Sequence, residues 1–312
     1  RGDRMAWPKL SSRRCERAAM RFTAHQTILN NVTESAAPTP TPAELYEVFR
    51  SRRHEMALLP QGSLALVNTQ WFYGEPGVAE TVWGAPGLWA ALPAGEKGVR
   101  LTATAAEGIT VDGTLVDGSV IVTGKDSEAA SEIVFNATQS GSIIRGEDGA
   151  YALRVWDSQS DDLQNFGSID SFAYNPDWVV TGTFTPIEGG RSASVSHLKD
   201  EGAARDKVIP GDITFTLDGV EYKPSAFKEG RALMIVFADA TSGDSTYSVG
   251  RFLMVAPNPD GTITLDFNRA YLPPCAFSYN FNCPMPPAEN RFPFAVKAGE
   301  KNVLNKAGEL LH

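Results

Sequence analysis

After residue 62, the apolar residues of this chain lose helical spacing and alternate in short runs between turn residues. The dipeptides Asp112-Gly113 and Asp218-Gly219 favour tight two-residue hairpin turns. Short strands joined by such turns bury their apolar faces in antiparallel sheets that pack as a sandwich or curl into a barrel. The sequence therefore predicts a mostly β protein.

The length of 312 residues fits about two domains, since domains commonly hold ~100–200 residues. Residues 158–177 are polar and rich in turn residues, which is typical of a domain boundary. We therefore expect a helix plus β-sandwich over residues 43–160 and an antiparallel β-barrel-like domain over residues 161–312, packed together. Residues 1–42 predict a poorly ordered arm that ends in a proline-rich linker.

One helix is expected, beginning at Thr41 or Pro42 and stopped by Pro60 and Gly62. Its apolar residues recur at helical spacing, which predicts that they face the core while charged residues face outward. The predicted inward set is Leu45, Val48, Phe49, Arg52 and Met56, and the predicted outward set is Glu44, Glu47, Arg50 and Arg53.

The negative charge of the chain argues against nucleic acid and anionic membranes as partners. The net charge is -9 and the pI is about 5.1, so no basic excess is present to bind nucleic acid or an anionic membrane surface. No run of ~18 apolar residues is present to span a membrane. Three cysteines are too few for a secreted disulfide scaffold, so we expect a cytoplasmic protein.

The segment 266–291 suits neither a helix nor a central strand. It holds five prolines, two cysteines, two arginines and four asparagines in 26 residues. Proline lacks the N–H group that both structures need, so the segment is predicted to be a rigid loop. Loops that present polar side chains on a rigid scaffold commonly carry function.

The polar residues of this loop support two interpretations. As a site, the arginines would hold a carboxylate or phosphate, the asparagines would orient it, and a carboxylate would move a proton. As architecture, the same groups would pair with one another and with backbone that the prolines leave unpaired. The candidate catalytic residues are Glu289, Tyr271 and Cys275, and the candidate ligand-binding residues are Tyr247, Arg251, Asn268, Arg269, Asn290 and Arg291.

A second polar group lies upstream, at residues 239–251. Asp239, Thr241 and Ser242 fit a turn whose hydroxyls bond to its own backbone. Tyr247 and Arg251 are four residues apart, so on a strand they point to the same face. If that face lines the mouth of the barrel under the 266–291 loop, both polar groups form one pocket.

Cys275 and Cys283 leave three interpretations open: a disulfide that staples the loop, two buried free thiols, or a reactive or metal-bound thiolate. Two cysteines without further Cys or His ligands do not make a zinc site, and only four histidines occur in the chain. No glycine-rich phosphate loop is present. The sequence indicates no metal and no organic cofactor.

The run of residues 266–271, with Cys275 and the later residues 289–291, resembles an uncharacterised prokaryotic family catalogued as domain of unknown function 1684. Residues 237–253 extend the resemblance, which covers roughly residues 43 to 301. The resemblance implies a shared fold and a shared site, and it supplies no reaction.

Residues 108–113, followed by Val116, look like part of a forkhead-associated domain, a class that binds phosphothreonine. That class needs a Ser-x-x-His motif, which does not occur between residues 70 and 150, and Asp112 stands where the class has Asn. The N-terminal β domain is therefore expected to act as a scaffold or lid. Its aromatic residues Trp71, Phe72, Trp83 and Trp89 are expected to pack in its core or interface.

Two functions follow from these patterns. The first is a protein that binds a small anionic metabolite in a pocket under the 266–291 loop, and that can transform it by hydrolysis or isomerisation. The second is a non-catalytic interaction module in which the loop is structural. The two differ in whether the polar side chains converge on a cavity or are consumed by internal contacts.

Overall fold

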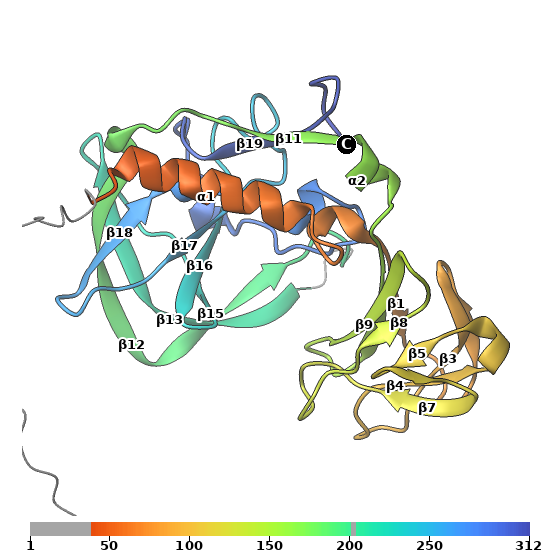
Figure 1. Ribbon diagram of the computed structural model, residues 1–312. Helices are drawn as coiled ribbons and strands as arrows, with labels where there is room; N and C mark the ends of the chain where they lie inside the picture. The colour runs from red at the N-terminus through yellow and green to blue at the C-terminus, as the bar shows by residue number, and fades with distance from the viewer. Residues whose placement is uncertain (1–38, 201–203) are drawn as a thin grey trace, which may run out of the picture. The chain divides into compact units, whose positions relative to one another are not determined.

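The computed structural model describes residues 39–200 and 204–312 (Figure 1). Most of the arm that the sequence predicts over residues 1–42 lies outside the described residues. Within them, the chain is mostly β, with one long N-terminal helix and several antiparallel sheets. The predicted fold class is confirmed.

Helix α1 (Pro42–Ala57) begins where the sequence predicts, because Thr41 caps it. The Thr41 hydroxyl accepts a hydrogen bond from the backbone N–H of Glu44 at 3.3 Å, and Glu44 Oε2 accepts one from the backbone N–H of Thr41 at 2.7 Å. This capping box satisfies N–H groups that have no partner inside the helix. The Tyr46 hydroxyl then ties the helix to the body by donating to the carbonyl of Phe172 at 2.7 Å.

The predicted orientation of α1 about its axis is wrong. Leu45, Val48 and Met56 are 41%, 47% and 57% exposed, whereas the Arg53 side chain is only 18% exposed. The reason is the buried carboxylate of Glu300, to which Arg53 donates. A buried charge left without its partner costs about 3–5 kcal/mol, which favours the orientation that presents Arg53 to Glu300.

The N-terminal β domain is a sandwich of two antiparallel sheets, with strand orders β1-β10-β9-β8-β5-β6 and β2-β3-β4-β7. Trp89, Leu101 and Leu153 are completely buried between the sheets. The strands are β1 (Leu66–Phe72), β2 (Glu80–Val82), β3 (Ala85–Ala91), β4 (Val99–Ala103), β5 (Thr110–Val111), β6 (Thr114–Leu115), β7 (Gly118–Val122), β8 (Ile133–Val134), β9 (Gln139–Arg145) and β10 (Tyr151–Asp157).

The aromatic residues of the sandwich divide between core and surface. Phe72 and Trp89 are buried as predicted. Trp83, in the turn between β2 and β3, is 72% exposed, so the prediction of core packing is wrong for this residue. A tight turn presents its side chains to solvent whatever their polarity.

Two hairpin turns take the form that their dipeptides predict. Asp112 and Gly113 have φ values of 52° and 75°, and Asp218 and Gly219 have φ values of 50° and 78°. A type I′ turn needs positive φ at both central residues, which Asp and Gly tolerate. The turns join β5 to β6 and β13 to β14.

The C-terminal part of the chain forms a half-barrel of two antiparallel sheets, with orders β14-β13-β12-β18 and β15-β16-β17. Its core holds Phe215, Phe237, Phe267 and Phe292, and the rings of Phe237 and Phe267 meet edge to face at 5.6 Å. The strands are β12 (Val179–Ser196), β13 (Ala204–Leu217), β14 (Val220–Tyr222), β15 (Phe227–Glu229), β16 (Ala232–Phe237), β17 (Arg251–Val255) and β18 (Thr262–Asp266).

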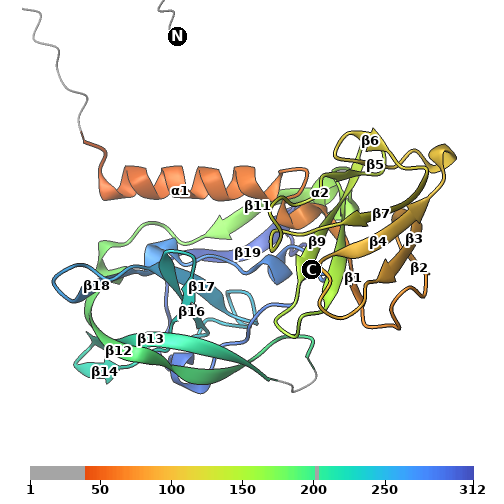
Figure 2. The ribbon, with the colours of Figure 1, turned by 90° about the horizontal axis from the view of Figure 1, so that it is seen from below.

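Helix α1 runs beside a separate two-stranded sheet, β11 (Phe166–Ser171) with β19 (Glu300–Asn305), which the short helix α2 (Asp161–Asn165) precedes (Figures 1 and 2). The end of α1 nearest the sandwich continues directly into the first sandwich strand through a short turn at Ser63–Ala65.

A third apolar cluster joins the sandwich to the half-barrel. Leu66 and Trp156 pack there with Val195 and Phe227. The Ser278 hydroxyl adds a hydrogen bond by donating to the carbonyl of Leu66 at 2.7 Å. The predicted packing of two β regions against each other is present, while the predicted domain boundary near residue 160 stays a prediction. Across residues 39–200 and 204–312, no helix is both long and apolar enough to cross a membrane.

Candidate functional site

The 266–291 segment is a loop, as the prolines predict. After β18 it contains three single-turn 3-10 helices, at Phe267–Arg269, Pro274–Ala276 and Ala288–Asn290. The loop is nevertheless well packed, since Phe267, Cys275 and Phe277 are almost completely buried in it.

Two asparagines, one near each end of the loop, are fully buried and bonded to backbone. Asn268 accepts a hydrogen bond from the backbone N–H of Asn175 at 2.9 Å and donates to the carbonyl of Asn175 at 2.9 Å. Asn290 accepts from the backbone N–H of Ser225 at 2.8 Å and donates to the carbonyls of Ser225 and Val236. Both side chains act as backbone substitutes that hold neighbouring segments together.

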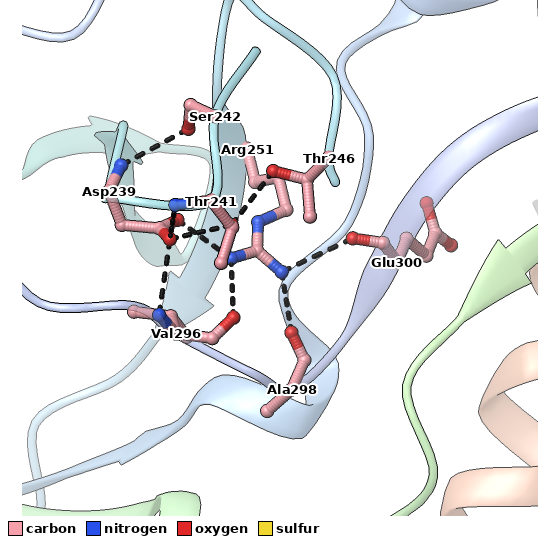
Figure 3. A network of polar contacts seen from close by, with 8 residues as sticks. All are labelled: Asp239, Thr241, Ser242, Thr246, Arg251, Val296, Ala298 and Glu300. Atoms are coloured by element: carbon pink, nitrogen blue, oxygen red, sulfur yellow. Dashed lines mark hydrogen bonds and ion pairs between the residues drawn. The ribbon is translucent and has the colours of Figure 1, made fainter. Parts of the chain in front are cut away.

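Arg251 is also fully buried, at the centre of a polar network (Figure 3). Its Nη2 donates to Asp239 Oδ2 at 2.7 Å and to the carbonyl of Val296 at 2.9 Å. Its Nη1 donates to the carbonyls of Ala298 at 2.5 Å and Glu300 at 3.2 Å. The guanidinium of Arg251 therefore links β17 to the segment before β19. Both of its terminal nitrogens are hydrogen-bonded inside the protein.

The upstream turn bonds to itself, as one interpretation of the sequence expects. Asp239 Oδ1 accepts from both the backbone N–H and the hydroxyl of Thr241, at 2.9 and 2.6 Å. The Ser242 hydroxyl accepts from the backbone N–H of Asp239 at 3.1 Å. Asp239 thus organises the turn and pairs with Arg251 at the same time (Figure 3).

The two candidate tyrosines pack inside the protein. The Tyr247 hydroxyl donates to the carbonyl of Cys275 at 3.1 Å, and burial raises its pKa. The Tyr271 ring lies under the Arg53 guanidinium, 4.8 Å from ring centroid to guanidinium carbon, and burial raises the pKa of its hydroxyl as well. A cation over an aromatic ring stabilises the pair by roughly 0.5–2 kcal/mol.

Cys275 and Cys283 are both free and buried. The backbone N–H of Cys275 donates to Cys283 Sγ at 3.3 Å. The neighbouring Cys283 thiol lowers the pKa of Cys275, and the neighbouring Cys275 together with burial raises the pKa of Cys283. Of the three interpretations of the sequence, the structure therefore has two buried free thiols.

The remaining candidates lie on the surface. Arg269 is half exposed and lies 3.5 Å from Asp266 Oδ2. Glu289 is exposed and accepts a hydrogen bond from the Ser225 hydroxyl, and Arg291 is exposed. None of the nine candidate side chains lines either of the two cavities described below.

The contact between α1 and β19 was missed by sequence reasoning. Arg53 Nε donates to Glu300 Oε1 at 2.6 Å and Arg53 Nη2 donates to Glu300 Oε2 at 3.0 Å. Glu300 Oε2 also accepts from the backbone N–H of Leu272 at 2.7 Å. No local pattern signals this pair, because its members are 247 residues apart in sequence.

One cavity, the α1 cleft, has a volume of about 380 Å³ and lies between α1, β11 and β19. Arg50 and His54 line it from the helix, and Glu300 lies among its lining residues. Hydroxyl groups complete the polar lining, from Ser51, Ser168 and Ser171.

A larger cavity, the Trp71 cleft, has a volume of about 550 Å³. Trp71 and Tyr73 form one wall, with ring centroids 6.1 Å apart and planes inclined by 21°. Charged residues form the rest: Glu147, Asp148, Asp200, Arg205 and Asp206.

The Trp71 cleft contains two internal ion pairs. Arg205 donates to both carboxylate oxygens of Asp200, at 2.8 and 3.0 Å. Lys207 pairs with Glu147. Trp71, in the aromatic run at residues 71–73, was the sequence signal for this cleft, although this residue was expected to pack in the core or interface of its domain.

The described ranges contain no group of three or more His, Cys, Asp or Glu residues placed to hold a metal ion.

Residues 164–301 match the model of a family described as protein of unknown function (DUF1684). The chain is also similar to the solution NMR structure of an uncharacterized protein from gene locus rrnAC0354 of Haloarcula marismortui. The sequence identity is 36%, the match covers 44% of this chain and 77% of that one, and the TM-score is 0.36. None of the curated proteins matches this chain.

Proposed function

We propose, from the premise that residues 164–301 place this chain in the DUF1684 family, that the protein is a non-catalytic interaction module of the cytoplasm. The family description names no activity, so the proposal rests on the geometry of this chain. Its docking surface is the outward face of α1, and its partner is a second copy of the same chain. The free thiols of Cys275 and Cys283 are consistent with a reducing compartment.

The state of the 266–291 loop supports a structural role for it. Backbone carbonyls of the protein accept the hydrogen bonds of two loop residues, Asn268 and Asn290, and of Arg251 on β17. Both terminal nitrogens of Arg251 are already hydrogen-bonded inside the protein and are not available to bind an anion. These contacts are those expected when the loop is architecture.

The observation that carries the proposal is the inverted polarity of α1. Its cationic residues Arg50 and Arg53 are partly buried against the body, while Leu45, Val48 and Met56 face solvent. A surface helix ordinarily buries its apolar stripe. An exposed apolar stripe on an ordered helix is typical of a protein–protein contact.

The stripe has the symmetry that self-association requires. Counted from Arg52, the apolar residues stand at seven and four positions before it (Leu45, Val48) and at four and seven positions after it (Met56, Leu59). A two-fold interface presents the same patch on both copies, so residue i meets j and j meets i. Two antiparallel α1 helices that cross at Arg52 pair Val48 with Met56 inside the helix, and Leu45 with Leu59, which lies two residues beyond the end of the helix.

Two charged residues lie near the crossing point. Arg52 and Glu55 are exposed, and neither makes an ion pair with another part of the described chain. In the antiparallel arrangement, Arg52 of one copy meets Arg52 of the other on the two-fold axis, and Glu55 of each copy lies about one helical turn away and offsets this contact between like charges. Such charges contribute mainly to orientation and specificity.

The size of the surface sets the strength of the contact. A helix of 16 residues is roughly 24 Å long at 1.5 Å per residue. A stable interface commonly buries about 1,200–2,000 Å², which exceeds the contact of one helix pair. We therefore expect a reversible dimer whose population rises with protein concentration.

Sedimentation velocity over a hundredfold range of concentration tests the proposal. We expect the weight-average mass to rise from the monomer value of 33.6 kDa toward twice that value. The double variant Val48→Glu, Met56→Glu should stay monomeric throughout, because four carboxylates would enter an apolar contact. Its melting temperature should be unchanged, since both side chains are exposed.

Ile121→Glu is the matched control, because Ile121 is 47% exposed on the sandwich, as Val48 is on α1. It should dimerise like the unmodified chain. A monomer at every concentration, or equal dissociation by the control, would contradict the proposal.

Cross-linking tests the register. In a Cys15→Ser background, Arg52→Cys should form a disulfide-linked dimer under air, because position 52 lies on the two-fold axis. Leu45→Cys alone should not, because its counterpart across the interface is Leu59. Efficient dimers from Leu45→Cys would indicate a parallel or unrelated contact.

A small anionic ligand remains the second candidate, at the α1 cleft. Arg50 favours it, because within the described part of the chain its one ion pair is an exposed contact with Glu47 on the same helix at 3.3 Å, which contributes about 0–1 kcal/mol. Calorimetric titration with inorganic phosphate and with succinate tests this. Binding that Arg50→Ala abolishes would support the candidate, and no heat with either anion would contradict it.

A further inference from the structure

The Trp71 cleft has the size and composition of a small-molecule site. Its volume of about 550 Å³ lies within the ~300–1,000 Å³ of ligand pockets. It is the larger of the two cavities described, and it lies away from the outward face of α1. What occupies it is therefore independent of the proposed self-association.

An aromatic platform forms one wall of the cleft. Trp71 lies on β1, and Tyr73 is the first residue after that strand. Because the two residues are two positions apart in extended chain, their side chains point to the same side. Tyr73 is 69% exposed, an unusual state for a large ring on an ordered segment. The rings are 6.1 Å apart and nearly parallel, which presents their faces together.

Gly146 makes room for this platform. A Cβ atom at position 146 would lie 3.0 Å from the Trp71 ring and 2.4 Å from Asp148 Oδ1. Such distances are shorter than ordinary contacts between carbon and its neighbours. The glycine thus lets the turn at residues 146–149 come close to the ring and brings Asp148 to the edge of the platform.

The cleft carries uncompensated negative charge. Four carboxylates line it, at Glu147, Asp148, Asp200 and Asp206. Two of them have cationic partners, Lys207 for Glu147 and Arg205 for Asp200. Within residues 39–200 and 204–312, Asp148 and Asp206 have no such partner, so four negative and two positive charges leave a net charge of -2.

Two further side chains are consistent with the net negative charge of the cleft. Burial and then the charge of Asp148 raise the pKa of the Tyr73 hydroxyl, which indicates a negative potential at the platform. Among the described residues, the buried His197 has no hydrogen-bond partner for Nδ1, which lies 3.8 Å from Asp200 Oδ2. The polar groups of the cleft are thus not saturated by one another.

Aromatic faces and carboxylates together select a cation. The face of an aromatic ring carries negative charge and attracts ammonium groups, most strongly when they are partly desolvated. An anion would meet two unpaired carboxylates. A neutral sugar could stack on the rings but would leave the negative charge uncompensated.

We propose that the Trp71 cleft binds a small organic ammonium ion, with Trp71 and Tyr73 contacting its alkyl groups and Asp148 and Asp206 balancing its charge. The Asp200–Arg205 pair forms a fixed polar wall that limits the size of the ligand. The proposed role is binding alone, without a chemical step.

Isothermal titration with choline and with its uncharged carbon isostere, 3,3-dimethylbutan-1-ol, tests the proposal. The two probes have the same shape, so a difference between them reports the charge. We expect choline to bind and the isostere to bind at least tenfold more weakly. Choline binding should weaken as salt is added, because exposed charges are screened.

Two variants locate the site. Tyr73→Ala should weaken choline binding by about 2- to 30-fold, the range that one cation–π contact supplies. Asp148→Asn should weaken choline binding without affecting the isostere. Neither change should alter the melting temperature greatly, since Tyr73 is exposed and Asp148 is on a turn.

Trp83→Ala is the matched control, because Trp83 is also a solvent-exposed aromatic residue of the sandwich, at 72% exposure. It should leave choline binding unchanged. Equal affinity for both probes, equal loss in Trp83→Ala, or binding of neutral sugars with none of choline would each overturn the proposal.

Discussion

Arg53 and Glu300 face each other across 247 residues of sequence, with two parallel hydrogen bonds of 2.6 and 3.0 Å. A planar guanidinium and a carboxylate match each other in this fork geometry. The pair explains why α1 turns its cationic side inward, and hence why its apolar residues face solvent. The surface on which the proposed self-association depends is thus a consequence of one buried ion pair.

The first prediction concerns that pair. Arg53→Ala should lower the free energy of unfolding by about 3–5 kcal/mol, because Glu300 would remain as a buried charge without a partner. Arg50→Ala removes an exposed pair of the same helix and should cost less than about 1 kcal/mol. Urea denaturation followed by circular dichroism measures both. Equal effects would show that the Arg53–Glu300 pair does not hold the helix.

The second prediction concerns the buried network of Figure 3. Arg251→Ala should cost at least about 3 kcal/mol, because it strands the Asp239 carboxylate and removes hydrogen bonds to three carbonyls. Arg269→Ala, which removes a half-exposed arginine of the 266–291 loop, should stay within about 0.5 kcal/mol. A loss of similar size in both variants would contradict the assignment of Arg251 to the core.

The third prediction concerns pH. Burial, followed by the charges of Arg205 and Lys207, lowers the pKa of His197, while Asp200 and Glu147 act in the opposite direction. The unfolded chain takes up a proton near the ordinary value of about 6.5, whereas the folded chain takes it up at lower pH. Acidification below about 6.5 therefore favours the unfolded state, and stability falls until the pH passes the folded pKa.

His197→Gln tests this directly. The variant should lose part of the decrease in unfolding free energy between pH 6.5 and 5 that the unmodified protein shows. Above pH 7, His197 is neutral in both the folded and the unfolded chain. The unfolding free energies of the two proteins should therefore change with pH in parallel. An identical slope in the acidic range would exclude His197 as its source.

The fourth prediction concerns the thiols. In a Cys15→Ser background, Cys275 and Cys283 should react with an aromatic disulfide reagent only as the protein opens, because both side chains are buried. The reaction should be slow in buffer and release two equivalents rapidly in denaturant. Fast, stoichiometric labelling of the native protein would restore the interpretation of a reactive thiolate.

The strand rhythm and the turn dipeptides predicted the fold class well, because they depend on neighbouring residues. The turns at Asp112 and Asp218 are examples, since positive φ at an Asp-Gly pair is a local preference. Strand length was harder to predict. The 18-residue strand β12 contains Pro186, Gly189 and Gly190, residue types that favour the end of a strand.

The interruption in β12 has a local cause that hides the continuity. Its pairing with β13 shifts between Pro186 and Arg191, where Gly189 and Gly190 have φ values of 73° and 70°. Glycines and a proline are ordinarily signals for the end of a strand. Here they mark an irregularity at which the strand bends and then continues.

The candidate site was less predictable, because the role of a polar residue depends on what lies opposite to it. Asn290 pairs with Ser225, 65 residues away, and Asn268 pairs with Asn175, 93 residues away. Composition marked the 266–291 loop as unusual, and prolines do leave backbone that needs partners. Whether those partners are ligand or backbone is decided by chain segments that no local pattern connects.

The contact between α1 and β19 joins two segments that the ribosome synthesises far apart in time. At ~5–20 residues per second, roughly 12–50 s separate the synthesis of Arg53 from that of Glu300. During that interval the helical segment has neither its ion-pair partner nor the strand beside which it lies. Residues 42–57 are therefore the part of the nascent chain that a chaperone should bind longest, and β19 is the strand that releases it.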